Sequence, residues 1–211
     1  RVADRFGRKK IILVMAVIFL IGSLGCATAP NVQMMITFRF ILGLAVGGAA
    51  AIVPVYIAEI VPANRRWQFV TLQELMIVSG QLIAYTSNAA INEVWGGETT
   101  WRWMLGIITI PALLLLVGVF FLPNSPRWLA ARGNFRDAQR VLDRLRDTSE
   151  QAKRELEEIR ESLKIKQSGW GLFTSSSHFR RAVYLGILLQ VMQQFTGMNV
   201  IMYYAPKIFE I

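Results

Sequence analysis

Residues 4–29 read DRFGRKKIILVMAVIFLIGSLGCATA, a short basic segment followed at once by an apolar run that carries no charge. The apolar run, 11–29, approaches the roughly 20 residues with which a helix crosses the hydrocarbon core of a bilayer. It is too long for the apolar core of a secretory signal peptide, which spans about 7–15 residues. We therefore expect a transmembrane helix that begins directly after the basic segment.

Four further apolar stretches of similar length follow along the chain: 34–58, 69–91, 102–122 and 182–206. Hydrophobic residues make up 54% of the 211 residues and charged residues only 18%, against about 25% charged in typical soluble domains. As a soluble protein the chain would leave a large apolar surface in water. The fold class predicted is therefore all-α, a polytopic membrane protein with five transmembrane helices and a cytoplasmic helical segment.

The basic residues lie in alternate connections between these stretches. Segment 1–10 holds five Lys or Arg, the connection at 30–33 none, the next one Arg65 and Arg66, the one at 92–100 none, and 123–181 thirteen. Cytoplasmic loops of membrane proteins carry an excess of Lys and Arg. We predict a cytoplasmic N-terminus, five crossings and an outer C-terminus. Because the net charge of +9 is spread through these loops, we expect no nucleic-acid partner.

The segment 134–166 is charged and amphipathic. Ala138, Val141, Leu142 and Leu145 mark one helix face, and Ala152, Leu156, Ile159 and Leu163 mark another. Thr148 and Gln151 have the spacing of a capping box between the two helices. We expect a solvated helical hairpin over the cytoplasmic face. The odd number of crossings and the first residue, Arg1, suggest a fragment of a longer protein.

Residues that would support catalysis or metal binding are sparse. The single histidine excludes a multi-histidine metal site, and the single cysteine excludes an intrachain disulfide. The sequence contains no pattern of a nucleophile with its base and no glycine-rich cofactor loop following a strand. We expect no enzymatic activity, no metal and no organic cofactor.

Several motifs, in order along the chain, resemble those of one family. Asp4–Lys10 (DRFGRKK) resembles the signature loop of the major facilitator superfamily. RFILGLAVGG at 39–48, PNSPRW at 123–128 and QQFTGMN at 193–199 are similar to motifs of its sugar porter family. The last 80 residues resemble bacterial galactose and arabinose proton symporters, whereas the stretch ELMIVSGQ at 74–81 is more similar to bacterial myo-inositol transporters.

The resemblance implies a twelve-helix fold built from two halves. Residues 1–122 would be part of the N-terminal half, with its third to sixth helices. Residues 123–181 would be the cytoplasmic helical linker, and 182–211 the seventh helix, which starts the C-terminal half. Helices 1–2 and 8–12 of the same protein would then lie outside this chain and act as its partners.

Three amides mark the last apolar stretch: Gln193, Gln194 and Asn199. Amides donate and accept hydrogen bonds, so they suit a ligand with many hydroxyl groups. Gly197 favours a break in the helix, and broken helices form binding sites in transporters. From the residues alone, amide packing between helices explains the pattern equally well. The resemblance implies that these amides contact substrate, together with Tyr203, which lies one turn beyond Asn199.

The stretch 69–91 places Glu74, Gln81 and Asn88 seven residues apart, on one stripe of a helix. An ionisable residue inside a membrane is a functional hypothesis by default. The resemblance implies a sugar-contacting Gln at the position of Glu74, so we expect Glu74 and Gln81 to bind substrate. The alternative is that Glu74 pairs with a nearby arginine at the cytoplasmic end.

A second group of charged residues is expected to act in gating. By the resemblance, the residues that lock and release the cytoplasmic side are Asp4, Arg5, Gly7, Arg8, Glu59, Arg66 and Arg127. Arg39 is the basic residue within the interior of an apolar stretch, where an unpaired charge is costly. The resemblance implies that it partners an acid on the first helix and takes part in proton coupling.

The function predicted is transport of a monosaccharide similar to galactose or arabinose by alternating access, with the proton as coupling ion, in the plasma (inner) membrane of a bacterium. Its partners would be the sugar or polyol and the lipid bilayer. Three alternatives remain open: a transporter of myo-inositol or another cyclic polyol, a passive sugar facilitator, and a membrane-embedded sugar receptor.

Overall fold

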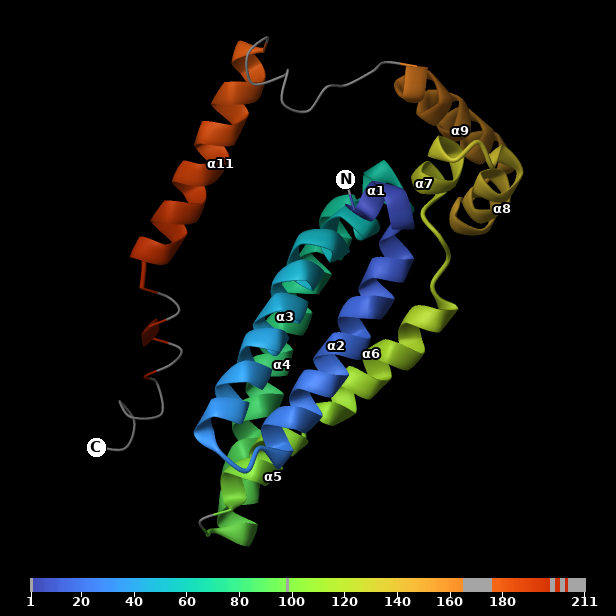
Figure 1. Ribbon diagram of the computed structural model, residues 1–211. Helices are drawn as coiled ribbons and strands as arrows, with labels where there is room; N and C mark the ends of the chain where they lie inside the picture. Colours follow the sequence, from blue (N-terminus) through green and yellow to red (C-terminus); the bar gives the residue numbers. More distant parts are fainter. Residues whose placement is uncertain (1, 98, 165–175, 198–199, 202–203, 205–211) are drawn as a thin grey trace. The chain divides into compact units, whose positions relative to one another are not determined.

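The computed structural model describes residues 2–97, 99–164, 176–197, 200, 201 and 204 (Figure 1). It divides into two compact units, Arg1–Leu163 and Lys164–Ile211, and each is described here by itself. The described residues form helices and turns without a strand, so the predicted all-α class is confirmed.

The first unit contains a helical bundle formed by the following elements: α1 (Val2–Phe6), α2 (Arg8–Thr28), α3 (Val32–Ile60), a 3₁₀ turn (Ala63–Arg65), α4 (Arg66–Trp95), α5 (Thr100–Gly106) and α6 (Thr109–Phe121). Among the described residues, α2, α3 and the combined segment Thr100–Phe121 are long and apolar enough to cross a membrane. Helix α4 covers the third expected stretch, 69–91, but it is not among the helices apolar enough to cross a membrane, and it carries the polar stripe of Glu74, Gln81 and Asn88. Its crossing therefore stays a prediction.

A turn at Ile107 and Ile108 separates α5 from α6 within the expected span 102–122. Pro111 has no amide hydrogen to donate to a preceding carbonyl, and it stands in the first turn of α6, where helix amides lack partners anyway. The chain thus begins a new helix at the proline, so the span is interrupted where one continuous helix was expected.

Helix α2 lies at the centre of the bundle and contacts α3, α5 and α6. Glycines let it approach α3 closely: a Cβ added to Gly25 would stand 2.3 Å from the Phe38 ring, and one added to Gly22 would stand 2.8 Å from Leu42. Small residues at such contacts let helix backbones come together in membranes. Toward the other end of α2, Ile12 packs with Tyr56 and Val119.

On α3 the small-residue pattern Gly43, Gly47 and Gly48 predicts close packing, and this holds for one of the three. A Cβ on Gly48 would stand 2.9 Å from Met15, whereas Gly43 and Gly47 face open space in the described part of the chain. The pattern-based prediction is therefore not met at Gly43 and Gly47 within this chain.

Three short helices complete the first unit: α7 (Pro126–Ala131), α8 (Phe135–Leu145) and α9 (Ser149–Lys164). The expected hairpin is α8 and α9, and the Gln151 amide donates to the Thr148 hydroxyl as the capping box predicts. Its apolar face packs on α7 in a small core of Leu129, Ala130 and Ala138, with Val141, Leu156 and Ile159 at its edge. The hairpin is therefore solvated on one face and anchored to α7 on the other. We call α7, α8 and α9 together the hairpin unit.

The basic segments gather at one end of the first unit. Figure 1 shows α1, the end of α3 and α7–α9 at the same end, and the α2–α3 connection and α5 at the opposite end. At that opposite end, Arg102 donates to the carbonyl of Ala29, the C-cap of α2, and lies 5.0 Å from the Trp101 ring. Arg102 thus caps a helix as well as standing among the tryptophans at this end.

The second unit contains α11 (Ser177–Phe195), which is N-capped by Ser176. It covers the first part of the expected span 182–206. The helix ends at Phe195, and Gly197 adopts a left-handed φ of 70°. The break predicted at Gly197 is confirmed.

The close approach at Gly25 gives a test of the α2–α3 packing. We expect Gly25→Ala to lower the free energy of unfolding by about 1–3 kcal/mol, as overpacking of a well-filled interior does. The matched control is Gly43→Ala, which meets open space and gains helix propensity of about 1 kcal/mol. Thermal unfolding of the purified chain in detergent measures both. Equal stability of the two variants would contradict the packing described.

Candidate functional site

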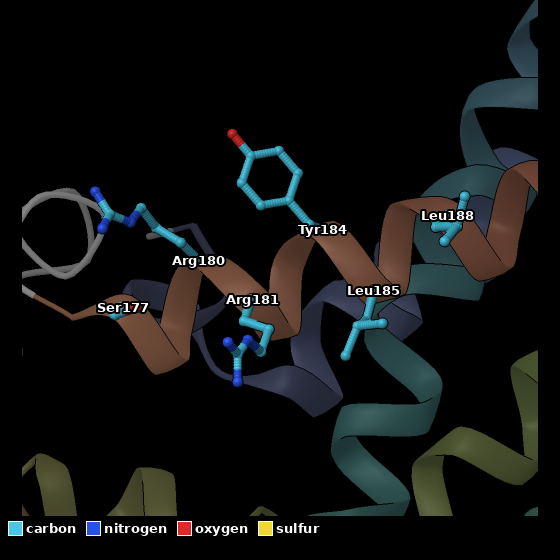
Figure 2. A pocket seen from close by; sticks show the side chains of 6 residues that line it. All are labelled: Ser177, Arg180, Arg181, Tyr184, Leu185 and Leu188. Carbon is cyan, nitrogen blue, oxygen red and sulfur yellow. The ribbon is translucent and has the colours of Figure 1, made fainter.

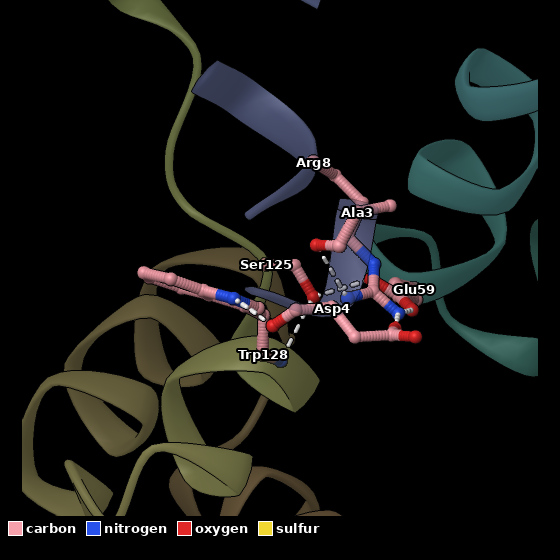
Figure 3. Close-up of polar contacts among 6 residues, drawn as sticks. All are labelled: Ala3, Asp4, Arg8, Glu59, Ser125 and Trp128. Carbon is pink, nitrogen blue, oxygen red and sulfur yellow. Dashed lines mark hydrogen bonds and ion pairs between the residues drawn. The ribbon is translucent and has the colours of Figure 1, made fainter. Parts of the chain in front are cut away.

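A buried arginine, Arg8, holds two carboxylates at the end of the bundle where the basic segments meet (Figure 3). Its Nη2 atom lies 2.9 Å from Asp4 Oδ1 and 3.0 Å from Glu59 Oε1, and its Nη1 donates to the carbonyl of Ala3. The Arg8 and Glu59 side chains are only 14% and 8% exposed, whereas Asp4 is 68% exposed. The pair with Glu59 is thus a buried ion pair between the start of α2 and the end of α3.

Ser125 connects this pair to α7. Its hydroxyl donates to Glu59 Oε2 at 2.5 Å and accepts from the backbone amide of Trp128 at 3.2 Å. A serine directly before a proline at the first helical position is a common helix start, because the hydroxyl satisfies an amide that the helix leaves unpaired. One hydroxyl therefore caps α7 and binds the carboxylate that Arg8 holds.

Trp128 closes the cluster over the turn between α1 and α2. Its indole Nε1 donates to the carbonyl of Asp4 at 2.9 Å. Gly7, the N-cap of α2, has a φ of 90°, and a Cβ there would stand 3.0 Å from the indole ring. Glycine is thus required at position 7 both by the left-handed backbone and by the indole above it.

The seven predicted gating residues fall into three groups. Asp4, Arg8 and Glu59 are bonded together, and Gly7 makes the turn that brings them there. Arg66 and Arg127 line a polar hollow with Glu59 and with Glu155 and Glu158 of α9. Arg5 contributes its backbone carbonyl, which accepts a hydrogen bond from the Arg132 guanidinium, while its own guanidinium lies over the Phe6 ring.

The Arg8 guanidinium is a positive charge held between the Asp4 and Glu59 carboxylates. Partial burial by itself raises the pKa of the Asp4 carboxyl, but the positive charges around it, Arg8 among them, hold it below its ordinary value. The Arg8 Nε atom is buried and has no hydrogen-bond partner among the described residues. The ion pairs to its Nη2 atom and the bond from Nη1 to the Ala3 carbonyl offset part of the cost of burying this guanidinium.

The predicted substrate residues lie in both units. Gln193 and Gln194 occupy the last turn of α11, directly before the break at Gly197, with exposed side chains. Asn199 and Tyr203 lie outside the described residues. The carbonyl of Gln194 accepts from the amide of Gly197, so the amide pair stands at the point where the helix opens.

In the first unit, Glu74 and Gln81 are exposed along α4. No ion pair joins Glu74 to any other described residue, so the alternative of a partner arginine nearby finds no support within residues 2–97 and 99–164. Arg39 is likewise exposed on α3 and forms no ion pair within that part of the chain.

A hollow on α11 does not involve the predicted substrate residues. Figure 2 shows its lining, which consists of Ser177, Arg180, Arg181, Tyr184, Leu185 and Leu188. These positions follow a spacing of three and four, so they form one stripe of a single helix. The stripe is basic at its start and apolar beyond, as expected of a helix that leaves a basic loop for a membrane.

Sequence reasoning missed three residues that the structure brings into play. Ser125 and Trp128 belong to the motif at 123–128, and the Ser-Pro pair could have indicated the helix cap. Tyr56 donates from its hydroxyl to the carbonyl of Pro123 at 2.6 Å. No periodicity or spacing marks that contact, because it depends on how α3 and the linker meet in space.

The unequal burial of the two carboxylates gives a test. We expect Glu59→Gln to lower the free energy of unfolding by about 3 kcal/mol, because it leaves a buried guanidinium without its buried counter-charge. The matched variant Asp4→Asn should cost less than about 1 kcal/mol, since Asp4 is largely exposed. Detergent-solubilised protein unfolded by a denaturant series gives both values. Similar losses for the two variants would show that the Glu59 pair is not the dominant one.

Comparison with known proteins places these features in a family. The family described as "Sugar (and other) transporter" matches residues 1–211. The galactose-proton symporter of Escherichia coli is 60% identical over 207 residues, which are 98% of this chain and 44% of that protein. The arabinose-proton symporter of Escherichia coli is 50% identical over 206 residues, 98% of this chain and 43% of that protein.

A solved transporter structure supports the same family assignment. The proton:xylose symporter XylE of E. coli, bound to 6-bromo-6-deoxy-D-glucose, aligns with a TM-score of 0.83 and 30% identity over 98% of this chain and 47% of that one. The chain thus spans a little under half the length of the transporters it matches. The named relatives are transporters, which agrees with the expectation that the chain is not an enzyme. The chain belongs to the sugar transporter family of the major facilitator superfamily.

Proposed function

We propose that this chain forms the third to seventh helices of a proton-coupled monosaccharide transporter that works by alternating access. In this proposal residues 1–122 belong to the N-terminal half, 123–181 form the cytoplasmic linker and 182–211 begin the C-terminal half. Helices 1–2 and 8–12 complete the protein. The support is the identity to galactose and arabinose proton symporters over nearly the whole chain.

The observation that carries the mechanism is the Arg8 cluster. One buried guanidinium and one hydroxyl hold together the start of α2, the end of α3 and the start of α7. Packed elements joined through a few polar bonds can move as a body, and rocking of such bodies around a central site is the mechanism of many transporters. Asp4, Arg5, Gly7, Arg8 and Glu59 would hold the cytoplasmic side of the N-terminal half. Arg66 and Arg127, beside them, would bind the opposite half when the gate closes.

The substrate site would combine the two halves. Gln193, Gln194, Asn199 and Tyr203 would come from the seventh helix, and Glu74 and Gln81 from α4. Amides and a carboxylate provide donors and acceptors for a polyhydroxylated ring. The helix is broken at Gly197, directly after the amide pair, and broken helices are typical of transporter binding sites.

Proton coupling is assigned to Arg39. A guanidinium within an apolar helix requires a counter-charge, and the first unit supplies none to it among its described residues. The proposal places that counter-charge on the first helix of the protein, where an acid could exchange its proton as the pair forms and breaks.

The membrane is proposed to be the plasma (inner) membrane of a bacterium, with the Arg8 cluster and the hairpin in the cytoplasm. The supporting observation is that the basic segments of the first unit meet at one end. A second candidate substrate is a cyclic polyol such as myo-inositol, which Glu74 favours because it replaces the amide that the family resemblance implies.

Uptake by a chimera tests the proposal. In this chimera the 211-residue chain replaces the matched 207 residues of the E. coli galactose-proton symporter. We expect accumulation of labelled galactose that a protonophore abolishes and that unlabelled arabinose competes. The unmodified symporter is the control. A chimera that reaches the membrane and equilibrates galactose without accumulating it would support a passive facilitator instead. Sugar binding without any counterflow would support a receptor.

Glu74→Gln in the same chimera tests the substrate. If Glu74 binds a monosaccharide, the variant should change the galactose concentration that gives half-maximal uptake by about tenfold. This is the effect expected from altering one hydrogen bond to a charged group. Gln73→Glu, one position away on a different helix face, is the matched control. Competition by myo-inositol alone, lost in Glu74→Gln, would overturn the monosaccharide assignment.

A further inference from the structure

Arg146 is a buried arginine that belongs neither to the gate cluster nor to the predicted substrate site. It is the C-cap of α8, and its side chain is 3% exposed. Its Nε and Nη2 atoms donate to the two oxygens of Glu155 on α9, at 2.5 and 2.7 Å. A bidentate pair of this kind fixes the C-terminal end of α8 against the first half of α9.

The remaining nitrogen of Arg146 leaves the hairpin. Nη1 donates at 2.8 Å to the carbonyl of Ile60, the last residue of α3. The final carbonyls of a helix lack intrahelical partners and carry partial negative charge, so a guanidinium there is favourable. The residue beside it, Glu59, carries the bond to Ser125. Adjacent residues at the end of α3 are thus bonded to two separate places: Glu59 to Ser125 before α7, and Ile60 to Arg146 at the connection between α8 and α9.

These attachments have a mechanical consequence. Tyr56 and Glu59 hold the beginning of the unit, at Pro123 and Ser125, whereas Ile60 holds its far part through Arg146. A body attached at one place can pivot about it, and a second, separate attachment restricts that motion. Arg146 is suited to this task because its planar fork binds Glu155 and the Ile60 carbonyl at once, which a single ammonium group does not reproduce.

We propose that Arg146 is a positioning residue that clamps the hairpin unit to the end of α3, so that the hairpin and the Glu59 side of the gate move as one body. Loss of the clamp leaves the α8–α9 connection held to the bundle by the Arg65–Asp147 pair at 3.6 Å, between side chains that are 55% and 71% exposed. Because exposed pairs of this kind are weak, we expect α8 and α9 to move more freely about α7. The hairpin then no longer moves together with the end of α3. The gating role of Glu59 rests on the proposed function, whereas the clamp itself rests on the bonds of Arg146 to Glu155 and to the Ile60 carbonyl.

Pulsed spin-label distances test the clamp in the chimera described above, with its cysteines, Cys26 among them, replaced by serine. One pair of labels, Asn64→Cys and Lys153→Cys, reports the distance from the end of α3 to α9. A second pair, Arg136→Cys and Lys153→Cys, reports the distance within the hairpin. Neither measurement requires sugar or transport, so failure of the clamp and failure of the proposed function remain distinguishable.

Two variants separate the clamp from hairpin folding. Arg146→Met removes the two bonds to Glu155 and the bond to Ile60, and we expect the α3–α9 distance to lengthen and its distribution to broaden. The exchange Arg146→Glu with Glu155→Arg restores the ion pair within the hairpin but leaves no donor at position 146 for the Ile60 carbonyl. We expect it to restore the within-hairpin distance and to leave the α3–α9 distribution broad. An unchanged α3–α9 distance in Arg146→Met, or its full recovery in the exchange, would overturn the proposal.

Discussion

The Arg8 guanidinium lies among helix ends and needs carboxylates beside it to offset its burial. The arrangement of the helix ends in the first unit follows from that requirement. An unpaired buried charge costs several kcal/mol, so the start of α2 stays beside Glu59 at the end of α3. The Ser125 hydroxyl donates to the other oxygen of the same carboxylate, and it also caps α7. Three helix ends far apart in sequence are thereby fixed around one carboxylate.

The rest of the unit divides its chemistry between its middle and its ends. In the middle, α2 and α3 approach closely at Gly22 and Gly25, where contact between apolar surfaces needs no directional bonds. At the ends, charged side chains meet carbonyls that end helices: Arg102 donates to Ala29 after α2, and Arg146 donates to Ile60 of α3. Polar bonds at helix ends can break and form without disturbing the apolar middle, which is the property that a rocking half requires.

Much of this fold could be predicted from the sequence because its strongest signals are periodic or cumulative. Long apolar runs predicted α2 and α3, and apolar residues three and four positions apart, such as Ala138, Val141 and Leu142, predicted the hairpin. Gly197 predicted the helix break from its own conformational freedom. In the site, Asp4, Arg8 and Glu59 were expected on the resemblance, and the structure bonds them together. Their role in gating stays a prediction.

What could not be predicted depends on single contacts between distant elements. Arg146 stands in a charged segment among similar residues, and nothing in its spacing separates a buried clamp from a solvated side chain. The interruption at Ile107 and Ile108 was hidden because Pro111 is tolerated inside membrane helices as a bend. Gly43 and Gly47 have the pattern of close packing, yet whether a partner faces them depends on elements that the pattern does not contain.

The account depends most on the claim that the Arg8–Glu59 pair is a mutually dependent buried pair. A double-mutant cycle with Arg8→Met and Glu59→Leu, read as unfolding free energy in detergent, tests it most directly. Arg8→Met leaves the Glu59 carboxylate without its guanidinium, and Glu59→Leu leaves Arg8 with only the largely exposed Asp4 carboxylate. The double variant replaces the Arg8–Glu59 pair by apolar groups. The account predicts that the double variant is at least as stable as either single one. Losses that simply add would contradict it, because two independent surface charges would behave in that way.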